Sequence, residues 1–272
     1  ALKFIRDNAK KPFFAYLPIT IPHAAMQCPE EDVAPFRKKF PQFEDKIGKY
    51  GHGTKVRNPV AAFAGMMTRM DRGVGQVLDL LDELKIADNT LVLFSSDNGP
   101  HHEGGHQPEF FNSNGPLKGH KRDLYEGGIR VPLIAYWPGR VKAGSVSDHI
   151  CAHWDLMPTF CELAKTSTPK HTDGISYVPA LTGGKQKKHN YLYWEFHSYG
   201  NAQAIRMGDW KAIRLKVKND PNAPIQLYNL KQDIGETKNI AATHPNVVKR
   251  IAPLFKEAHT PSERFPLFAK KR

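Results

Sequence analysis

The chain has 272 residues, of which 40% are hydrophobic and 24% charged, a balance typical of a globular protein and too apolar for a disordered one. No stretch reaches the roughly 20 apolar residues that a membrane-spanning helix needs, so no membrane span is expected. The formal net charge is +12, but the basic residues are dispersed and no zinc finger, recognition helix or RNA-binding motif accompanies them, which argues against a nucleic-acid partner.

The chain opens with residues 2–6, which are typical of the end of a helix, followed by an uninterrupted apolar run at 13–17 that predicts a buried strand. A domain that starts on a helix tail and a central strand is expected to begin inside a longer protein. Residues 24–57 are polar and rich in Pro, Lys and Gly, and they predict a long surface excursion.

A long helix is the clearest predicted element. Asn58 is a good N-cap and Pro59 suits the first helical position. Apolar residues then recur with a period of about 3.6 up to Lys85, which is the pattern of one buried helix face. Gly73 and Gly75 lie on this helix, and each costs about 1 kcal/mol relative to Ala. Close packing is therefore expected at these two glycines.

Two continuous apolar runs, 90–96 and 131–136, predict parallel strands covered on both faces. Residues 155–164 predict a short helix. The alternation of helices and strands favours an α/β fold with a mainly parallel, layered sheet and helices on both faces.

The pattern changes from about Tyr191. Short strands are predicted, with Gly208-Asp209 as a hairpin turn, at 191–196, 204–207, 210–214 and 226–228. A helix over 245–258 follows. These elements predict a small antiparallel sheet with one helix, so we expect two domains, 1–184 and 185–272.

Asp97, Asn98 and Gly99 directly follow the predicted strand 90–96. Ligands of open parallel sheets collect beyond the carboxyl ends of the strands. A carboxylate and an amide oxygen suit a hard cation such as Ca²⁺ or Mg²⁺. The same three residue types are also common in plain turns, so the tripeptide alone leaves both interpretations open.

A cation-rich loop lies a short way downstream, at residues 115–122. Its Lys118 carries a compact charge that suits a sulfate or phosphate oxygen, and its glycines allow the backbone to approach a ligand closely. By itself, a lysine-rich loop is more commonly a solvated surface.

Together these segments resemble the sulfatase family of the alkaline phosphatase superfamily. The resemblance spans nearly the whole chain in order, through Leu17-Pro18, Pro22-His23, 96–99, 104–106, 116–119, 125–132, 173–183, Met207-Gly-Asp-Trp-Lys211 and Leu227-Tyr-Asn-Leu230. It implies the C-terminal portion of a sulfatase.

The resemblance also implies roles for individual residues. Asp97 and Asn98 would bind the active-site cation, usually Ca²⁺ with Mg²⁺ as the alternative. Lys118 would contact the sulfate, and His23 would lie beside it as a hydrogen-bond or proton donor. Apart from the resemblance, His101, His102 and His106 closely follow the metal motif and could line a substrate pocket. The alternative is a zinc site, which their spacing and the absence of cysteine partners disfavour. Arg122 would either reach the anionic substrate or face water.

The nucleophile of the family is missing. It is a formylglycine made from Cys or Ser in a Cys/Ser-x-Pro/Ala-x-Arg motif, and none of the three cysteines, Cys28, Cys151 and Cys161, stands in one. They form no disulfide framework either, so free thiols are expected. The N-terminal Asp pair that shares the metal is absent as well. We therefore expect the nucleophile in a missing N-terminal half of the same fold, and no activity from this chain alone.

The expected activity of the full-length parent is hydrolysis of organic sulfate esters, by a metal-assisted formylglycine mechanism, on a sulfated small molecule or a sulfated glycan. Two alternatives stay open: a phosphodiesterase or phosphonate hydrolase of the same superfamily, and a non-catalytic protein that binds sulfated glycans. Family habit implies a periplasmic or secreted location.

Overall fold

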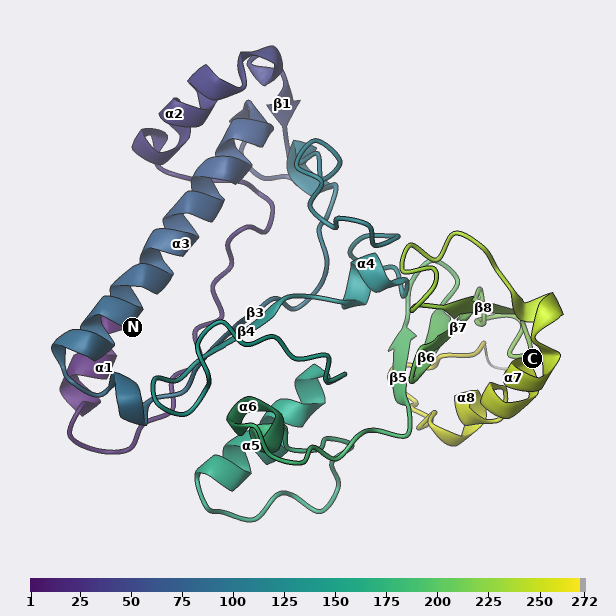
Figure 1. The fold of residues 1–272 in the computed structure, drawn as a ribbon. Helices are drawn as coiled ribbons and strands as arrows, with labels where there is room; N and C mark the ends of the chain where they lie inside the picture. Colours follow the sequence, from purple (N-terminus) through teal and green to yellow (C-terminus); the bar gives the residue numbers. More distant parts are fainter. Residues whose placement is uncertain (270–272) are drawn as a thin grey trace. The chain divides into compact units, whose positions relative to one another are not determined.

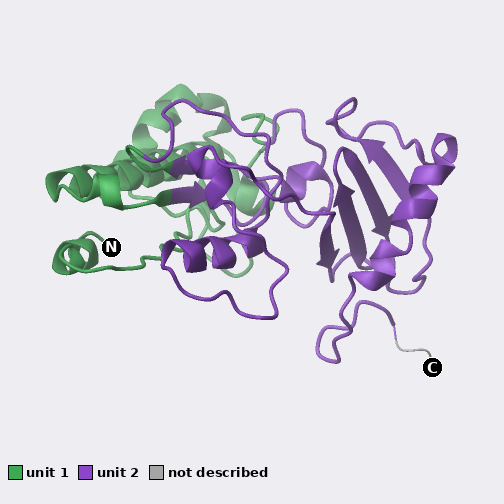
Figure 2. Cartoon of the chain, turned by 60° about the horizontal axis from the view of Figure 1, so that its bottom comes forward, with its two compact units in different colours: residues 1–92, 101–113, 136–139 green, residues 93–100, 114–135, 140–272 purple. Residues whose placement is uncertain are grey.

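The computed structural model describes residues 1–269, so the last three residues of the predicted domain 185–272 lie outside the described part. The chain divides into two compact units (Figure 2). Unit 1 comprises residues 1–92, 101–113 and 136–139, and unit 2 comprises 93–100, 114–135 and the chain from 140 onward. The predicted domain boundary at residue 184 stays a prediction.

Unit 1 is organised by the long helix α3, Pro59–Glu83 (Figure 1). Asn58 caps it as predicted, because its side-chain oxygen accepts a hydrogen bond from the Ala61 N–H at 3.0 Å. The other elements of the unit are α1 (Leu2–Asn8), α2 (Glu30–Lys39), η1 (Pro41–Phe43), β1 (Ile47–Gly48), β2 (Val56–Arg57), η2 (Ala87–Asn89) and η3 (Glu103–Gly105).

Helix α2 packs against α3, and together they bury a cluster made of Met26, Val33, Ala61, Ala62 and Met66. The surface excursion expected over 24–57 therefore contains a helix. Its polar composition concealed it, since only Asp32 and Val33 of α2 are buried. Charge favours the helix, with three acidic residues in its first turn and three basic residues in its last.

Two expectations for unit 1 are wrong. Residues 13–17 form no strand, and Phe14 and Tyr16 are 66% and 76% exposed. A strand requires a hydrogen-bonded neighbour, and no described strand pairs with this run. Gly73 and Gly75 are not close-packed, because a Cβ at either would meet nothing within 4 Å.

Unit 2 holds most of the small sheet β3 (Val92–Ser95) with β4 (Leu133–Tyr136). The short helix α4, Glu126–Ile129, precedes β4. Further along are η4 (His153–Asp155), α5 (Leu156–Leu163) and α6 (Val178–Thr182). The buried Asp155 ties this region together, since its carboxylate accepts from the N–H groups of Ala152 and Ile175 at 2.8 and 2.7 Å.

The C-terminal part of unit 2 contains the predicted antiparallel sheet, whose strands lie in the order β5-β6-β7-β8 (Figure 1). Its strands are Leu192–Phe196, Ala202–Met207, Trp210–Leu215 and Ile225–Asn229. Met207 pairs with Trp210, which confirms Gly208-Asp209 as the hairpin turn. The predicted helix 245–258 is split at Pro253 into α7 (Pro245–Ile251) and α8 (Leu254–Glu257), after η5 (Ala241–Thr243).

Side chains alternate between the two faces of this sheet. Ile205, Ala212 and Leu227 pack against Ile251 and Phe255 of the two helices. On the opposite face, Ala204, Ile213 and Tyr228 pack against Leu124, next to α4. The sheet therefore buries one face against its own helices and the other against the segment that carries α4.

Candidate active site

The predicted metal ligands Asp97 and Asn98 lie directly after β3, in a loop fixed by main-chain contacts within unit 2. The Gly99 N–H donates to the Gly128 carbonyl at 3.0 Å. A Cβ at Gly99 would stand 1.8 Å from the Gly127 carbonyl oxygen, so only glycine permits this approach. The loop is thereby held against α4.

The side chains of this loop fit a hard cation. The Asp97 carboxylate is exposed and accepts no hydrogen bond or ion pair among the described residues. The Asn98 amide nitrogen donates to the Gly99 carbonyl at 2.9 Å, which leaves the amide oxygen as an available ligand. An anionic and a neutral oxygen are the donors that Ca²⁺ and Mg²⁺ prefer.

Lys118 reaches the same helix from the cation-rich loop. The Gly127 N–H donates to the Lys118 carbonyl at 2.7 Å. The Lys121 N–H donates to the Pro100 carbonyl at 2.7 Å, which joins the two loops directly. Among the predicted site residues, Asp97, Asn98 and Lys118 are thus brought together around α4.

The Lys118 ammonium lies in a cage formed by Tyr125 before α4, Tyr228 on β8 and Glu236 in the segment after β8. It donates to the Glu236 main-chain carbonyl at 3.0 Å. It also lies 4.2 Å from the centre of the Tyr125 ring and 5.5 Å from that of Tyr228. Both tyrosine hydroxyls donate to the Gln226 side-chain oxygen, at 2.6 and 2.9 Å, which fixes the two rings.

A buried ionic network lies beneath this cage. The Lys211 ammonium contacts Glu126 Oε1 at 2.7 Å, and Arg206 contacts Glu126 Oε2 at 2.9 Å. Burial works against ionisation of Glu126, but Lys211 and Arg206 hold its pKa below the usual range. Burial raises the pKa of Glu236 to about 7, although the Lys211 ammonium 3.8 Å away acts in the opposite direction.

The other predicted catalytic residue, His23, belongs to unit 1 and is exposed. Its ring lies edge-on to Tyr50, with 5.5 Å between centroids. The neighbouring Pro22 carbonyl is 3.2 Å from Nε2 of the buried His101. His101 Nδ1 accepts from the Glu103 N–H at 3.0 Å, so Nε2 carries the proton and donates to Pro22.

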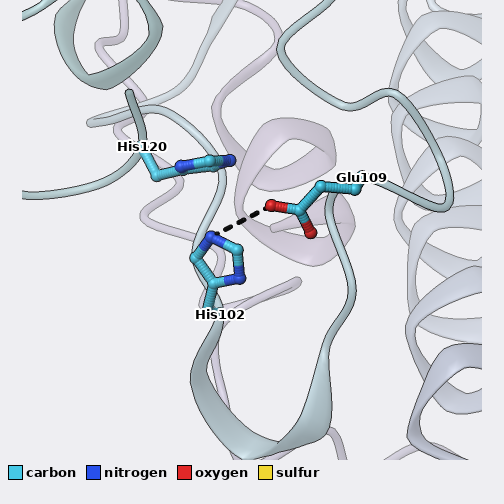
Figure 3. Close-up of side chains that lie close together, drawn as sticks. All are labelled: His102, Glu109 and His120. Carbon is cyan, nitrogen blue, oxygen red and sulfur yellow. Dashed lines mark ion pairs between the residues drawn. The ribbon is translucent and has the colours of Figure 1, made fainter. Parts of the chain in front are cut away.

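The two predicted substrate-binding residues lie in different units. His102 belongs to unit 1, where its Nε2 lies 3.3 Å from Glu109 Oε1 (Figure 3). Arg122 belongs to unit 2 and has a positive φ of 82°, in the left-handed region that few side chains adopt. Its role as a substrate contact stays a prediction.

Sequence reasoning missed the residues that surround Lys118. Gln226 and Tyr228 lie within or next to the segment 227–230, which the sequence marks as a family signature without indicating a role. Tyr125 likewise lies in the segment 125–132. Glu236 lies outside every quoted segment, and it is 118 residues from Lys118.

Comparison with known proteins places the chain in a family. A family model described as Sulfatase matches residues 1–166, and a second, described as N-sulphoglucosamine sulphohydrolase, C-terminal, matches residues 119–259. The first match covers more than half of the chain. The chain therefore belongs to the sulfatase family.

Individual relatives agree with this assignment. An N-acetylgalactosamine-6-O-sulfatase of Bacteroides thetaiotaomicron is 28% identical, over 96% of this chain and 50% of the relative. The human steryl-sulfatase is 35% identical, over 74% of this chain and 32% of the relative. The chain thus spans about half, or less, of the length of these curated relatives.

Solved structures support the predicted fold class. The crystal structure of Ps i-CgsB in complex with k-i-k-neocarrahexaose is 31% identical with a TM-score of 0.78, over 94% of this chain and 52% of that one. A phosphonate monoester hydrolase of Agrobacterium radiobacter, 20% identical with a TM-score of 0.65, shares the fold. The α/β class predicted from the sequence is confirmed. None of the described helices is long and apolar enough to cross a membrane.

Proposed function

We propose that this chain forms part of a sulfuric ester hydrolase that acts on sulfated glycans. The observation that carries the proposal is the convergence on α4 of the Asp97-Asn98 loop and the Lys118 loop, in a chain of the sulfatase family. One loop offers oxygen ligands for a cation and the other a fixed ammonium group. Together they suit an oxyanion whose charge must be neutralised.

In this proposal, Asp97 and Asn98 hold a divalent cation, Ca²⁺ or Mg²⁺. Such a cation would polarise the sulfate oxygens when bound. Lys118 contacts a sulfate oxygen, and its position is fixed by the Glu236 carbonyl and the two tyrosine rings. His23 donates a hydrogen bond or a proton to the ester oxygen, and His102 and Arg122 contact the rest of the substrate.

The substrate class is supported by the relatives and by charge. Several relatives are named N-acetylgalactosamine-6-sulfatase or N-acetylgalactosamine-6-O-sulfatase, and one Ps i-CgsB structure is a complex with k-i-k-neocarrahexaose. The net charge of +12 favours a polyanionic glycan over a neutral one. A sulfated small molecule is the alternative, in view of the likeness to steryl-sulfatase.

We further propose that the nucleophile is a formylglycine outside these residues, because the Cys/Ser-x-Pro/Ala-x-Arg motif does not occur in the sequence. The chain alone is then inactive. A periplasmic or secreted location is proposed from family habit.

Hydrolysis of a fluorogenic aryl sulfate tests the proposal, with Ca²⁺ present and an aryl phosphate as the competing substrate. The chain alone should give no turnover, and a protein extended upstream should prefer the sulfate. Asp97→Ala should abolish that activity, whereas Asp79→Ala, at an exposed site on α3, should leave it unchanged. Preference for the phosphate would refute the proposed ester class. Turnover by the chain alone that Asp97→Ala removes would refute the missing nucleophile.

Calcium binding to the chain can be measured separately by calorimetry. Asp97→Ala should weaken it and Asp79→Ala should not. Binding that is equal in the two variants would remove Asp97 from the metal site, whatever the activity.

A further inference from the structure

Glu236 contacts Lys118 and α4 at the same time, through different atoms. Its main-chain carbonyl accepts the Lys118 ammonium at 3.0 Å. Its side-chain Oε2 accepts from the Glu126 N–H, the first residue of α4, at 2.7 Å. The side chain is fully buried. The carboxyl group therefore fixes the position of the carbonyl to which Lys118 is bound.

The backbone at Glu236 supports a constrained role. Its φ is +50°, a left-handed conformation that costs a residue with a side chain on the order of 1 kcal/mol or more. The preceding Gly235 runs close to the other loop, since a Cβ there would lie 3.1 Å from the Pro116 carbonyl oxygen. Holding this turn against the Lys118 loop requires an anchor, and the bond from the Glu126 N–H supplies one.

Lys118 itself retains donors for a ligand. An ammonium group carries three N–H donors, and among the described residues only the Glu236 carbonyl accepts one of them. The Tyr125 and Tyr228 rings stabilise the charge without accepting a conventional hydrogen bond. One N–H donor thus holds the Lys118 ammonium in place, and the other two can donate hydrogen bonds to an anion.

We propose that Glu236 is a positioning residue for Lys118. The Glu236 carbonyl, in the turn that follows β8, holds the sulfate-contacting ammonium, and the Glu236 carboxyl fixes that carbonyl to α4. The sulfate contact of Lys118 rests on the proposed function. The positioning of Lys118 by Glu236 rests on the contacts described above.

The charged and titratable groups around Glu236 come from several elements. Glu126 lies on α4, Lys211 on β7, Tyr228 on β8 and Lys118 on the cation-rich loop. Arg206 on β6 and Arg130 at the end of α4 act through Glu126, and Asp233 acts on Lys118. Any pH response of Lys118 must therefore be assigned to Glu236 by substitution.

The experiment uses the chain itself, with its lysines reductively methylated with ¹³C and the Lys118 signal assigned from Lys118→Arg. Ring currents of the tyrosine cage should place the Lys118 methyl signal upfield of the other lysines. Glu236→Gln keeps an oxygen for the Glu126 N–H and should keep that position. Glu236→Ala should return the signal to the range of exposed lysines. An unshifted wild-type signal, or one that Glu236→Ala does not move, would overturn the proposal.

A pH titration tests the proposal without the Glu236→Ala variant, which could fail for the separate reason that it does not fold. The Lys118 signal of the wild type should move with an apparent pKa of about 7, and that of Glu236→Gln should stay constant. Glu195→Gln, on β5 of the same sheet, is the matched control and should retain the transition. A transition that persists in Glu236→Gln, or is absent from the wild type, would show that Lys118 does not respond to the titration of Glu236.

Kinetics of the upstream-extended protein separate this proposal from the proposed function. Glu236→Ala should lower kcat for an aryl sulfate by about 100-fold, the scale of misplacing a catalytic group, with rescue by Glu236→Gln. If Lys118→Met abolishes sulfate hydrolysis but the methyl signal ignores Glu236, positioning fails and the function stands. If the Lys118 methyl signal responds to Glu236 substitutions but the extended protein hydrolyses no sulfate, the proposed function is refuted and the positioning of Lys118 by Glu236 is supported.

Discussion

The ammonium of Lys211 lies 2.7 Å from the carboxylate of Glu126, and the two side chains are only 0% and 2% exposed. Charges buried this deeply are stable only when they are paired, because the interior solvates an isolated charge poorly. The pair joins β7 of the C-terminal sheet to α4, around which the candidate site is assembled.

Removing Lys211 should therefore be costly. Lys211→Met leaves Glu126 with Arg206 and the more exposed Arg130, and it removes the ammonium group nearest the Glu236 carboxyl. We therefore expect a loss of about 3–5 kcal/mol in the free energy of unfolding. Urea denaturation followed by the fluorescence of Trp194 and Trp210 measures it. Lys249→Met, at an exposed site on α7, is the control and should cost little. A loss below about 1 kcal/mol would show that the pair is not isolated from water.

Glu236 should make stability depend on pH. Its pKa is about 7 in the folded chain against a usual value of 4.5, so the folded state binds a proton that the unfolded state has lost. This contribution is complete below pH 4.5 and disappears as the pH rises through 7. The stability of wild type relative to Glu236→Gln should fall by about 3 kcal/mol over this interval. Chemical denaturation at several pH values measures it, and a difference that is constant or rises with pH would contradict the assignment.

Asn58 should be a strong cap for α3. It accepts from the Ala61 N–H and donates to the Phe40 carbonyl and to Glu44, both at 3.0 Å, while its φ is +46°. Asn58→Ala should cost about 2 kcal/mol or more in thermal unfolding, since it loses the cap and keeps the strained backbone. Asn58→Gly removes the same side chain but accepts the positive φ, so it should cost less. Equal losses would mean that backbone strain contributes nothing.

Substitution of the glycines Gly73 and Gly75 of α3 is expected to raise stability rather than lower it. A Cβ at Gly73 would meet no atom within 4 Å, so Gly73→Ala adds helix propensity without a clash. We expect a gain of about 1 kcal/mol in stability, and the same at Gly75. Gly65→Ala is the contrasting variant, because a Cβ there would lie 2.8 Å from the Asp32 carbonyl oxygen, and it should destabilise. A loss on Gly73→Ala would show that this surface is covered in solution.

Elements with a local signal could be predicted from the sequence. The cap and period of α3 and the hairpin at Gly208-Asp209 depend on neighbouring residues, and the structure confirms both. The run at 13–17 failed because a strand depends on a partner, which no local pattern reveals. Helix α2 was missed because it shows little apolar periodicity and is held partly by the ion pairs of Asp32 with Arg69 and Arg72.

The candidate site likewise contains residues that local sequence patterns predict and residues that only tertiary contacts reveal. Asp97, Asn98 and Lys118 could be selected from residue type and from their place after a strand, and main-chain contacts bring their loops to α4. Glu236 could not be selected, because its link to Lys118 uses a main-chain carbonyl, which is the same for every residue type. Only the folded structure shows that this carbonyl faces the ammonium.

Glu236 binds Lys118 through its main chain and α4 through its side chain, and this separation affects which substitutions the sequence can accept. Because Lys118 binds a main-chain carbonyl, a substitution at position 236 does not remove the hydrogen-bond acceptor. It removes only the carboxyl group that holds this carbonyl in place. Substitutions at 126, 211 and 236 should consequently be inherited together, and a lineage that replaces the buried charges by apolar residues should change all three.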